Sequence, residues 1–469
     1  MVDNLTTSNR KILIGSILLS ILAIKLDPYF WIGALLLIFL ITFQIYLTKN
    51  LILFFILSLL VVASDIDESL RIVLTLSVLC FLSYIFFKDY GFQFSLYPKL
   101  PIAIKGFILL TIATLIFSSV FSENVYVGFN ETMRQIIFFI MWYIFFAYLS
   151  EEKDAYNYIL VLISAGTLVA LIINYSFIIS DKSVYLLQTQ GIIHEGGSFK
   201  NVTAAAGIFA VSIPLTFVIM LPKLKIKKAL TYFLYFILLI QVVGLFLTNS
   251  RSGLIAVFIS ISIILFILEK KIFKKFILFA LASFTLFYFV LPSISELFAI
   301  YFRTDRIFEN TRYYLWDMSI RIIRDNPVWG TGPGQFKYFM YNNMPVMLGS
   351  WEESQITWIF KNAGLGESHN FFLFKTAELG LFGLLGAIFL PVIFIYFSYR
   401  VMKRNFNNKK NYFLLVGIFS LGIGLLIRSF FESTGLLSNG WITRDLPFWI
   451  CFAIIIYFNG IGTETSNKK

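Results

Sequence analysis

The residue best suited to do chemistry is His369, one of two histidines in a chain of 469 residues. It stands in "GLGESHNFFLFKTAELGLFG" (364–383), where a polar stretch passes into an apolar one. The pattern predicts a helix beginning at His369, and the first turn of a helix disfavours the imidazolium form. A neutral imidazole can accept a proton, so His369 is a candidate general base. The alternative is a histidine at the membrane interface without a catalytic role.

Two glycines of the same expected helix, Gly380 and Gly383, lie on the helix face of His369. Small residues on one face allow two helices to approach closely. We therefore expect another helix to pack beneath the histidine.

Two further apolar helices are expected to begin beside cationic residues, Lys200 in "HEGGSFKNVTAAAG" and Arg251 in "LTNSRSGLIA". A helix N-terminus presents unpaired N–H groups and about half a positive charge, which favours an anion. Ser250 and Asn370 stand at two of these starts and join Lys200 and Arg251 in the predicted substrate-binding set. The alternative for each residue is helix capping or anchoring at the membrane interface.

Another candidate cation, Arg312, lies in "ENTRYYLWDMSIRIIRDNP". This stretch predicts a helix capped by Asn310 or Thr311, running to about Arg324 and ended by the following "DNP". The glycine-rich "GTGPGQF" after it lacks the spacing of a dinucleotide-binding motif, so we expect only a turn there.

The side chains of this helix predict where Arg312 points. Trp316, Ile320 and Ile323 form an apolar stripe that begins with Arg312. Arg321 is about 180° away round the helix and should not share a site with Arg312. Either the helix lies on the membrane surface, or its stripe docks over the bundle and directs Arg312 into a cavity.

The elements that must position these residues are membrane helices, because 58% of the residues are hydrophobic and only 14% are charged. One run, 51–64, is short for a span; if it and 69–87 form a re-entrant or tilted pair, twelve spans remain. We therefore predict an all-α polytopic membrane bundle of 12–14 transmembrane helices over residues 1–469. The apolar runs are 11–26, 29–47, 51–64, 69–87, 103–121, 134–150, 156–179, 203–221, 229–248, 252–268, 273–291, 371–399, 412–431 and 446–461.

The net charge of +12 predicts the orientation of this bundle and needs no nucleic acid to explain it. With the N-terminus in the cytoplasm, most lysines fall on cytoplasmic loops, whereas most arginines fall on the outer side. One large extracytoplasmic segment, 292–370, then carries the Arg312 helix. The guanidinium fork suits phosphate and carboxylate, so we expect an anionic ligand on the outer side.

The stretches "LTNSRSGLIA", "TRYYLWDMSIRIIRDNPVWGTGPGQF" and "SHNFFLFKTAELGLFG", in that order on a many-spanning chain, resemble the O-antigen ligase and O-antigen polymerase superfamily. The resemblance is specific over residues 245–390, the expected catalytic region. It implies a glycosyltransferase of the integral-membrane C-type class, inverting, metal-independent and without a cofactor. The implied location is the bacterial inner membrane, with the active site facing the periplasm.

The resemblance also implies partners and residue roles. The donor is a glycan on a polyprenyl diphosphate, and the acceptor is a hydroxyl of a lipid A core or of another glycan, in contact with membrane lipids. Arg251 and Arg312 are expected to hold the donor diphosphate, and His369 to orient or deprotonate the acceptor hydroxyl. The concentrated motifs and the single late outer segment favour a ligase. The alternatives with the same donor are a polymerase and a protein O-oligosaccharyltransferase.

Two other hypotheses differ in kind. A glycolipid flippase or transporter would explain the many helices, but transport pathways place ionisable residues deep in the spans, where Glu378 is the only acid expected. Asp65 and Asp67 in "SDIDES" could hold a divalent metal, although two carboxylates on a short polar turn are common in ordinary loops.

Overall fold

The structure is a computed structural model that describes residues 48–61, 68–91, 97–179, 201–221, 224, 227–286, 311–342, 366–439 and 441–466. Within these ranges the regular elements are helical and no strand occurs, which confirms the predicted all-α class. The expected spans at 11–26 and 29–47 lie outside the described residues. The same holds for Lys200, Asp65 and Asp67.

The other expected spans coincide with helices. Eight of the described helices, α5, α7, α9, α10, α11, α17, α18 and α19, are long and apolar enough to cross a membrane. The helices are α3 (Thr48–Val61), α4 (Glu68–Tyr90), α5 (Ile102–Val120), α6 (Val125–Ala147), α7 (Glu152–Ile179), α9 (Val202–Ile219), α10 (Lys228–Leu247), α11 (Arg251–Leu268), α12 (Lys270–Thr285), α14 (Thr311–Asp325), α15 (Phe336–Asn342), α17 (Phe371–Arg404), α18 (Lys409–Arg428) and α19 (Ile442–Ser466).

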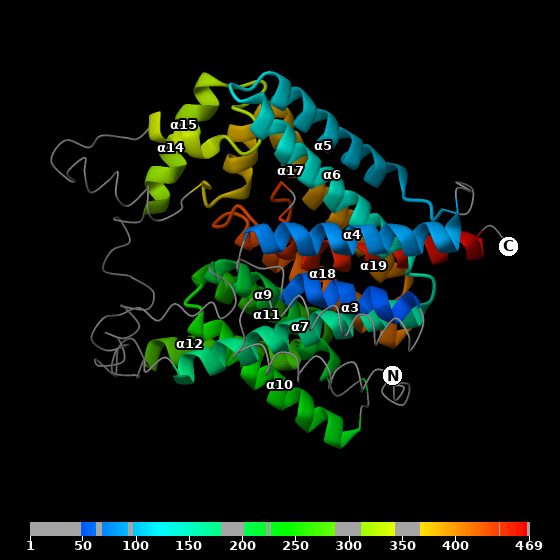
Figure 1. Ribbon diagram of the computed structural model, residues 1–469. Helices are drawn as coiled ribbons and strands as arrows, with labels where there is room; N and C mark the ends of the chain where they lie inside the picture. Colours follow the sequence, from blue (N-terminus) through cyan, green and yellow to red (C-terminus); the bar gives the residue numbers. More distant parts are fainter. Residues whose placement is uncertain are drawn as a thin grey trace.

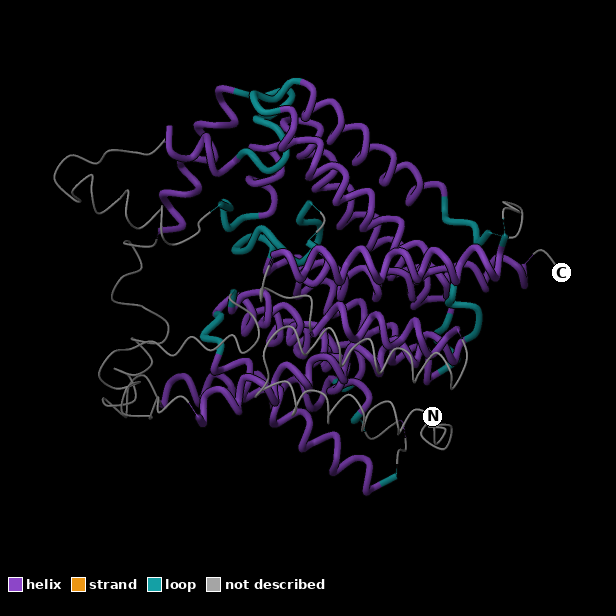
Figure 2. The backbone as a smooth tube through the Cα atoms, in the orientation of Figure 1, coloured by secondary structure: helices purple, strands orange, loops and turns teal. Residues whose placement is uncertain are grey.

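The helices form two groups (Figure 1). Helices α5, α6, α14, α15 and the start of α17 lie at the top of the view, and α7, α9, α10, α11 and α12 lie at the bottom. Between them, α18 packs along α11 and α9, and α19 packs against α17 and α6. Loops gather at the left of the view, where the two groups face each other (Figure 2).

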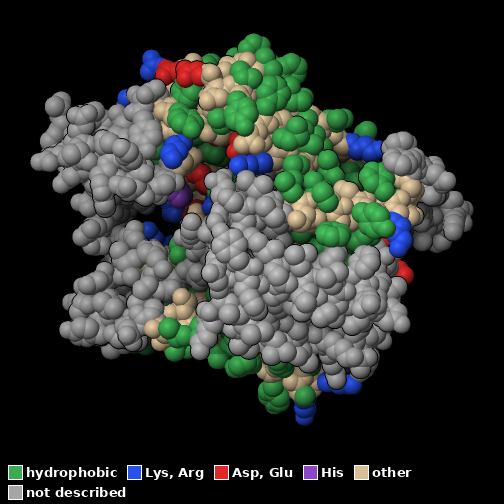
Figure 3. Space-filling view, in the orientation of Figure 1, with side chains coloured by type: hydrophobic (Ala, Val, Ile, Leu, Met, Phe, Trp, Pro, Cys, Tyr) green, Lys and Arg blue, Asp and Glu red, His purple; other side chains and the backbone are tan. Residues whose placement is uncertain are grey.

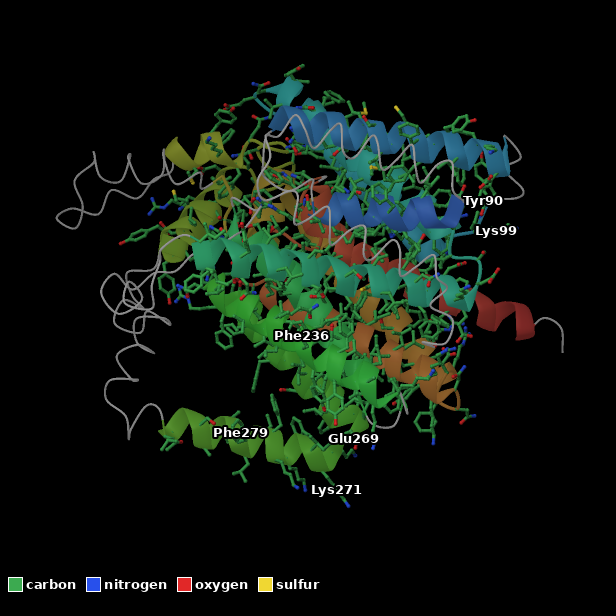
Figure 4. All side chains as sticks on the ribbon, turned by 60° about the horizontal axis from the view of Figure 1, so that its bottom comes forward. Tyr90, Lys99, Phe236, Glu269, Lys271 and Phe279 are labelled. Atoms are coloured by element: carbon green, nitrogen blue, oxygen red, sulfur yellow. The ribbon has the colours of Figure 1, made fainter. Side chains whose placement is uncertain are left out.

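The outer surface of the bundle is apolar, as a lipid-facing surface must be. Hydrophobic side chains cover much of the described surface (Figure 3). Phe236 on α10 and Phe279 on α12, both labelled in Figure 4, are 58% and 72% exposed. In water such a surface would cause aggregation, whereas lipid tails cover it without cost. The protein is therefore a multi-pass membrane protein.

Helix α17 is broken near its start at Gly380, where φ is 64° and ψ is −153°. A Cβ atom on Gly380 would lie 2.1 Å from the carbonyl oxygen of Val328, and one on Gly383 would lie 2.3 Å from that of Lys375. The expectation that these glycines let another helix pack beneath His369 is therefore wrong. They allow a backbone break into which the turn after α14 fits.

That turn begins at Pro327 and continues into the predicted "GTGPGQF" turn (330–336). It pairs the backbone groups freed by the break. The amides of Thr331 and Gly332 donate to the carbonyls of Ala377 and Glu378 at 3.0 and 2.9 Å. On the other side of the break, the amide of Leu381 donates to the Pro327 carbonyl at 3.0 Å. Without these bonds the break would leave buried polar groups unpaired. Residues 371–379 thus form a short first half-helix of α17, held by the turn.

Candidate active site at the starts of four helices

A buried carboxylate, Glu432, joins the predicted site residues. It lies in the α18–α19 loop (429–439), and its side chain is 2% exposed. Its Oε1 accepts hydrogen bonds from Arg312 Nη2 at 2.9 Å and from Ser252 Oγ at 3.0 Å. Its Oε2 lies 3.3 Å from His369 Nδ1. One side chain therefore connects the starts of α14, α11 and α17.

Glu432 is ionised in this setting. Burial by itself would raise its pKa, but the hydrogen bond with His369 and the positive charges of Arg428 and Arg312 lower the pKa to about 2. Opposite charges within hydrogen-bonding distance favour the charged form of an acid. The carboxylate is thus a fixed negative charge between an arginine and the histidine.

His369 precedes Asn370, the N-cap of α17, and has a positive φ of 51°. It is therefore outside the first turn, and the expectation that the helix start keeps the ring neutral loses its basis. Glu432 orients the ring instead. When Nδ1–H donates to the carboxylate, a neutral ring carries its lone pair on Nε2, which can accept a proton. The His369 side chain is 21% exposed, so the site is accessible.

Arg312 reaches Glu432 because of the way α14 packs. The helix bounds agree with the prediction, but the buried side chains are Leu315, Met318 and Ile322, each fully buried, while Ile320 is 57% exposed. The expected stripe is therefore wrong, because the true one is Leu315, Met318 and Ile322, three, six and ten positions after Arg312. This buried stripe packs on α15 and on the first half-helix of α17.

The position of Arg321 agrees with its predicted separation from Arg312. Its Nε donates to Asp317 Oδ2 at 2.9 Å, and both side chains are about half exposed. Leu315, Met318 and Ile322 pack α14 on α15 and α17, and Arg312 contacts the buried Glu432, which agrees with the docked arrangement of the helix.

Arg251 is the first residue of α11, whose N-cap is Ser250, and it is partly exposed. The next residue, Ser252, donates to Glu432, so the α11 start lies at the same loop. Ser250 Oγ accepts from the Gly253 amide at 3.3 Å. Ser250 therefore caps the helix, and its contact with substrate stays a prediction.

Asn370 likewise has structural contacts. Its Oδ1 accepts from the Leu373 amide at 3.0 Å, and its Nδ2 donates to the Phe430 carbonyl at 3.1 Å. The amide of Phe371 donates to the Ser429 carbonyl at 2.8 Å. Asn370 thus caps α17 and ties its start to the α18–α19 loop, and its substrate contact also stays a prediction.

Arg428, at the end of α18, brings the start of α9 to the same place. Its side chain is buried, Nη2 donates to the Thr203 carbonyl at 2.6 Å, and Nη1 donates to the Thr434 carbonyl at 3.2 Å. Four helix starts, those of α9, α11, α14 and α17, therefore meet one loop. Figure 3 shows a histidine beside basic and acidic side chains. His369 is the one histidine among the described residues.

A second buried network involves two side chains of the first half-helix of α17, Lys375 and Glu378. Lys375 Nζ donates to Asn439 Oδ1, and Asn439 Nδ2 donates to Glu378 Oε2 at 2.7 Å. The amide of Gly334 donates to Glu378 Oε1 at 2.9 Å. Lys375 and Glu378 are 2% and 1% exposed. The network binds the half-helix to the turn after α14 and to the α18–α19 loop.

Sequence reasoning missed Glu432, Arg428 and Lys375 as parts of these networks. The available signal was a pair of ionisable residues, Arg428 and Glu432, at the outer end of an apolar run. For a metal, the described residues contain no group of three or more His, Cys, Asp and Glu side chains arranged to hold an ion. Asp65 and Asp67 are not among them.

Fold and site together define a multi-pass helical membrane protein with arginines, a histidine and several helix starts at one end of its bundle. Residues 234–388 match the family described as O-antigen ligase. This match confirms the resemblance to the O-antigen ligase and polymerase superfamily and supports a glycosyltransferase-like function on a glycan or lipid-linked substrate. It includes Arg251, Arg312 and His369, whereas Glu432 lies beyond it. No curated protein matches the chain.

Proposed function

We propose that the protein is an O-antigen ligase-type glycosyltransferase. It transfers a glycan from a polyprenyl diphosphate carrier to an acceptor hydroxyl of a lipid A core, at the periplasmic face of the inner membrane. The observation that supports this most is the contact of Glu432 with Arg312 through one oxygen and with His369 through the other. That arrangement brings a diphosphate-binding cation and a base to one place.

The donor diphosphate would lie at the starts of α11 and α14, held by Arg251 and Arg312. As the bond between the sugar and the diphosphate breaks, negative charge grows on the leaving group. Guanidinium forks and helix N–H groups fixed in place stabilise that charge without reorganising. Lys200, Ser250 and Asn370 complete the proposed substrate contacts.

The acceptor hydroxyl would attack the anomeric carbon from the opposite side and give its proton to Nε2 of His369, with inversion at that carbon. Glu432 holds the other ring nitrogen and stabilises the imidazolium that forms, as the carboxylate does in a Ser-His-Asp triad. A well-placed general base contributes about 10²–10⁴-fold in rate. The proton and the leaving group then depart on opposite sides of Glu432.

The flippase hypothesis has less support. Lys375 and Glu378 are buried in α17, but both belong to its first half-helix. Both are hydrogen-bonded to Asn439, and Glu378 also accepts from the turn after α14. A transport pathway needs ionisable groups that line a route through the bundle. These two hold local structure together.

The test is release of free polyprenyl diphosphate by the purified protein from a lipid-linked glycan, with and without a lipid A core acceptor, in EDTA. Release that requires the core is the expected result. Release from the donor alone with longer lipid-linked chains would mean a polymerase, and a requirement for a protein acceptor would mean an O-oligosaccharyltransferase. Loss of release in EDTA would give a role to a metal, with Asp65 and Asp67 as first candidates, and no release at all would favour a flippase.

A further inference from the structure

The cation proposed to bind the donor is already bound to an anion of the protein itself. Arg312 Nη2 and Glu432 Oε1 are 2.9 Å apart, and the carboxylate is buried while the Arg312 side chain is 22% exposed. A diphosphate that approaches the exposed part of Arg312 therefore meets a guanidinium that is already paired with a buried carboxylate. In a low-dielectric site, a guanidinium that is already paired with one anion attracts a second anion less strongly.

The other arginines near Glu432 form hydrogen bonds or ion pairs with neighbouring groups of the protein. Arg428 donates to the carbonyls of Thr203 and Thr434, and Arg444 Nη1 pairs with Glu367 Oε1 at 2.8 Å. Oε2 of Glu432 lies against His369. Arg312 is thus the partly exposed arginine in direct contact with the carboxylate among the described residues.

From this geometry we propose that Glu432 competes with the diphosphate for Arg312, which weakens donor binding and helps the diphosphate product leave. This inference rests on the proposed function. The donor diphosphate is esterified at both ends, whereas the released product has a free terminal phosphate and carries more negative charge. Arginines alone would therefore bind the product more tightly than the donor. A carboxylate that forms its ion pair with Arg312 again weakens the binding of the product.

The proposal predicts opposite effects of one substitution on binding and on catalysis. Glu432→Gln keeps the size of the side chain and removes its charge. Arg312 then loses the negative charge of Glu432, so an isoprenoid diphosphate should bind roughly ten-fold more tightly, a typical size for a coupling between two ligands of one group. Glycan transfer should nevertheless slow, because His369 loses its anionic partner. Damage to the site would weaken both.

The experiment measures the Kd of farnesyl diphosphate for the purified full-length protein in detergent, together with the rate of glycan transfer. The variants are Glu432→Gln, Glu432→Asp and, as a matched control, Glu367→Gln, which removes an equal charge from the Arg444 pair near His369. We expect tighter binding only in the Glu432 variants. The Asp variant, which draws the carboxylate back from Arg312, should bind more tightly than wild type and less tightly than the Gln variant.

Unchanged or weaker binding in Glu432→Gln, or equal tightening in Glu367→Gln, would overturn the inference. If Glu432→Gln does not fold, Glu432→Asp decides alone, and binding no tighter than wild type refutes the competition. The proposed function fails separately: wild-type protein that does not bind the diphosphate, or binds it equally well after Arg251→Ala and Arg312→Ala, would remove the donor site itself.

Discussion

Two buried charge networks meet the α18–α19 loop, and they differ in what they leave accessible. Around Glu432, the partners Arg312 and His369 keep 22% and 21% of their side chains exposed. Around Glu378, both Lys375 and Asn439 are buried, and each carboxylate oxygen has a partner within the protein. Similar chemistry thus serves two purposes: the accessible network can meet a substrate, and the enclosed one fixes the backbone that carries the first.

The largest expected effect tests the accessible network. His369→Ala should lower glycan transfer by about 10²–10⁴-fold, because the acceptor loses its base, and should leave thermal unfolding nearly unchanged. The measurement is turnover with lipid-linked glycan and core acceptor, with membrane insertion and the unfolding temperature followed in parallel. Wild-type turnover in this variant would remove His369 from the site.

The next effect compares two arginines of α14. Arg312→Ala should lower transfer about 10²–10³-fold, because a fixed charge opposite the leaving diphosphate is lost. Arg321→Ala, which breaks an exposed pair with Asp317 on the other side of the helix, should change transfer less than about two-fold. Equal losses in the two variants would show that the face assigned to α14 is wrong.

The enclosed network should respond in stability and not in chemistry. Lys375→Met removes the buried donor to Asn439 Oδ1, which costs about 1–3 kcal/mol, whereas Lys375→Met with Glu378→Gln also removes the buried carboxylate and should recover part of the loss. Thermal unfolding in detergent measures this. Folded protein of either variant should keep most of its turnover. A loss of turnover in fully folded double variant would mean that this network, too, takes part in the reaction.

The smallest effect is a pH dependence of stability from Glu432. Its pKa is lowered from 4.5 to about 2, so its contribution is complete above the unfolded-state pKa and is lost as the pH falls from about 4.5 through 2. Acidification over that range should therefore destabilise wild-type protein more than Glu432→Gln. The unfolding temperature of both proteins as a function of pH is the readout, and parallel curves would speak against an ionised Glu432.

The helices could be predicted from the sequence because lipid imposes a strong rule: each span must be apolar and long enough. The starts of α11, α14 and α17 followed from local signals, such as the polar residue before each apolar run. The predictions that proved wrong depended on contacts between segments that are distant in the sequence. Ile320 looks as apolar as Ile322, and only the position of α15 and α17 decides which is buried.

The partner of His369 was missed for the same reason. Glu432 is 63 residues away in sequence, and a single acid in a short loop carries no periodic signal. The role of Gly380 was also out of reach, because a glycine in an apolar run usually means close helix packing. That it marks a backbone break becomes visible only with the turn of residues 327–332 beside it.

The fit between that turn and α17 is reciprocal. A Cβ atom on Gly330 would lie 2.3 Å from the carbonyl carbon of Glu378, and one on Gly380 would lie 2.1 Å from the carbonyl oxygen of Val328. Neither stretch can therefore be transplanted alone. A chimaera that takes "SHNFFLFKTAELGLFG" from this protein must also take "DNPVWGTGPGQF", since the histidine segment is only half of an interlocking pair.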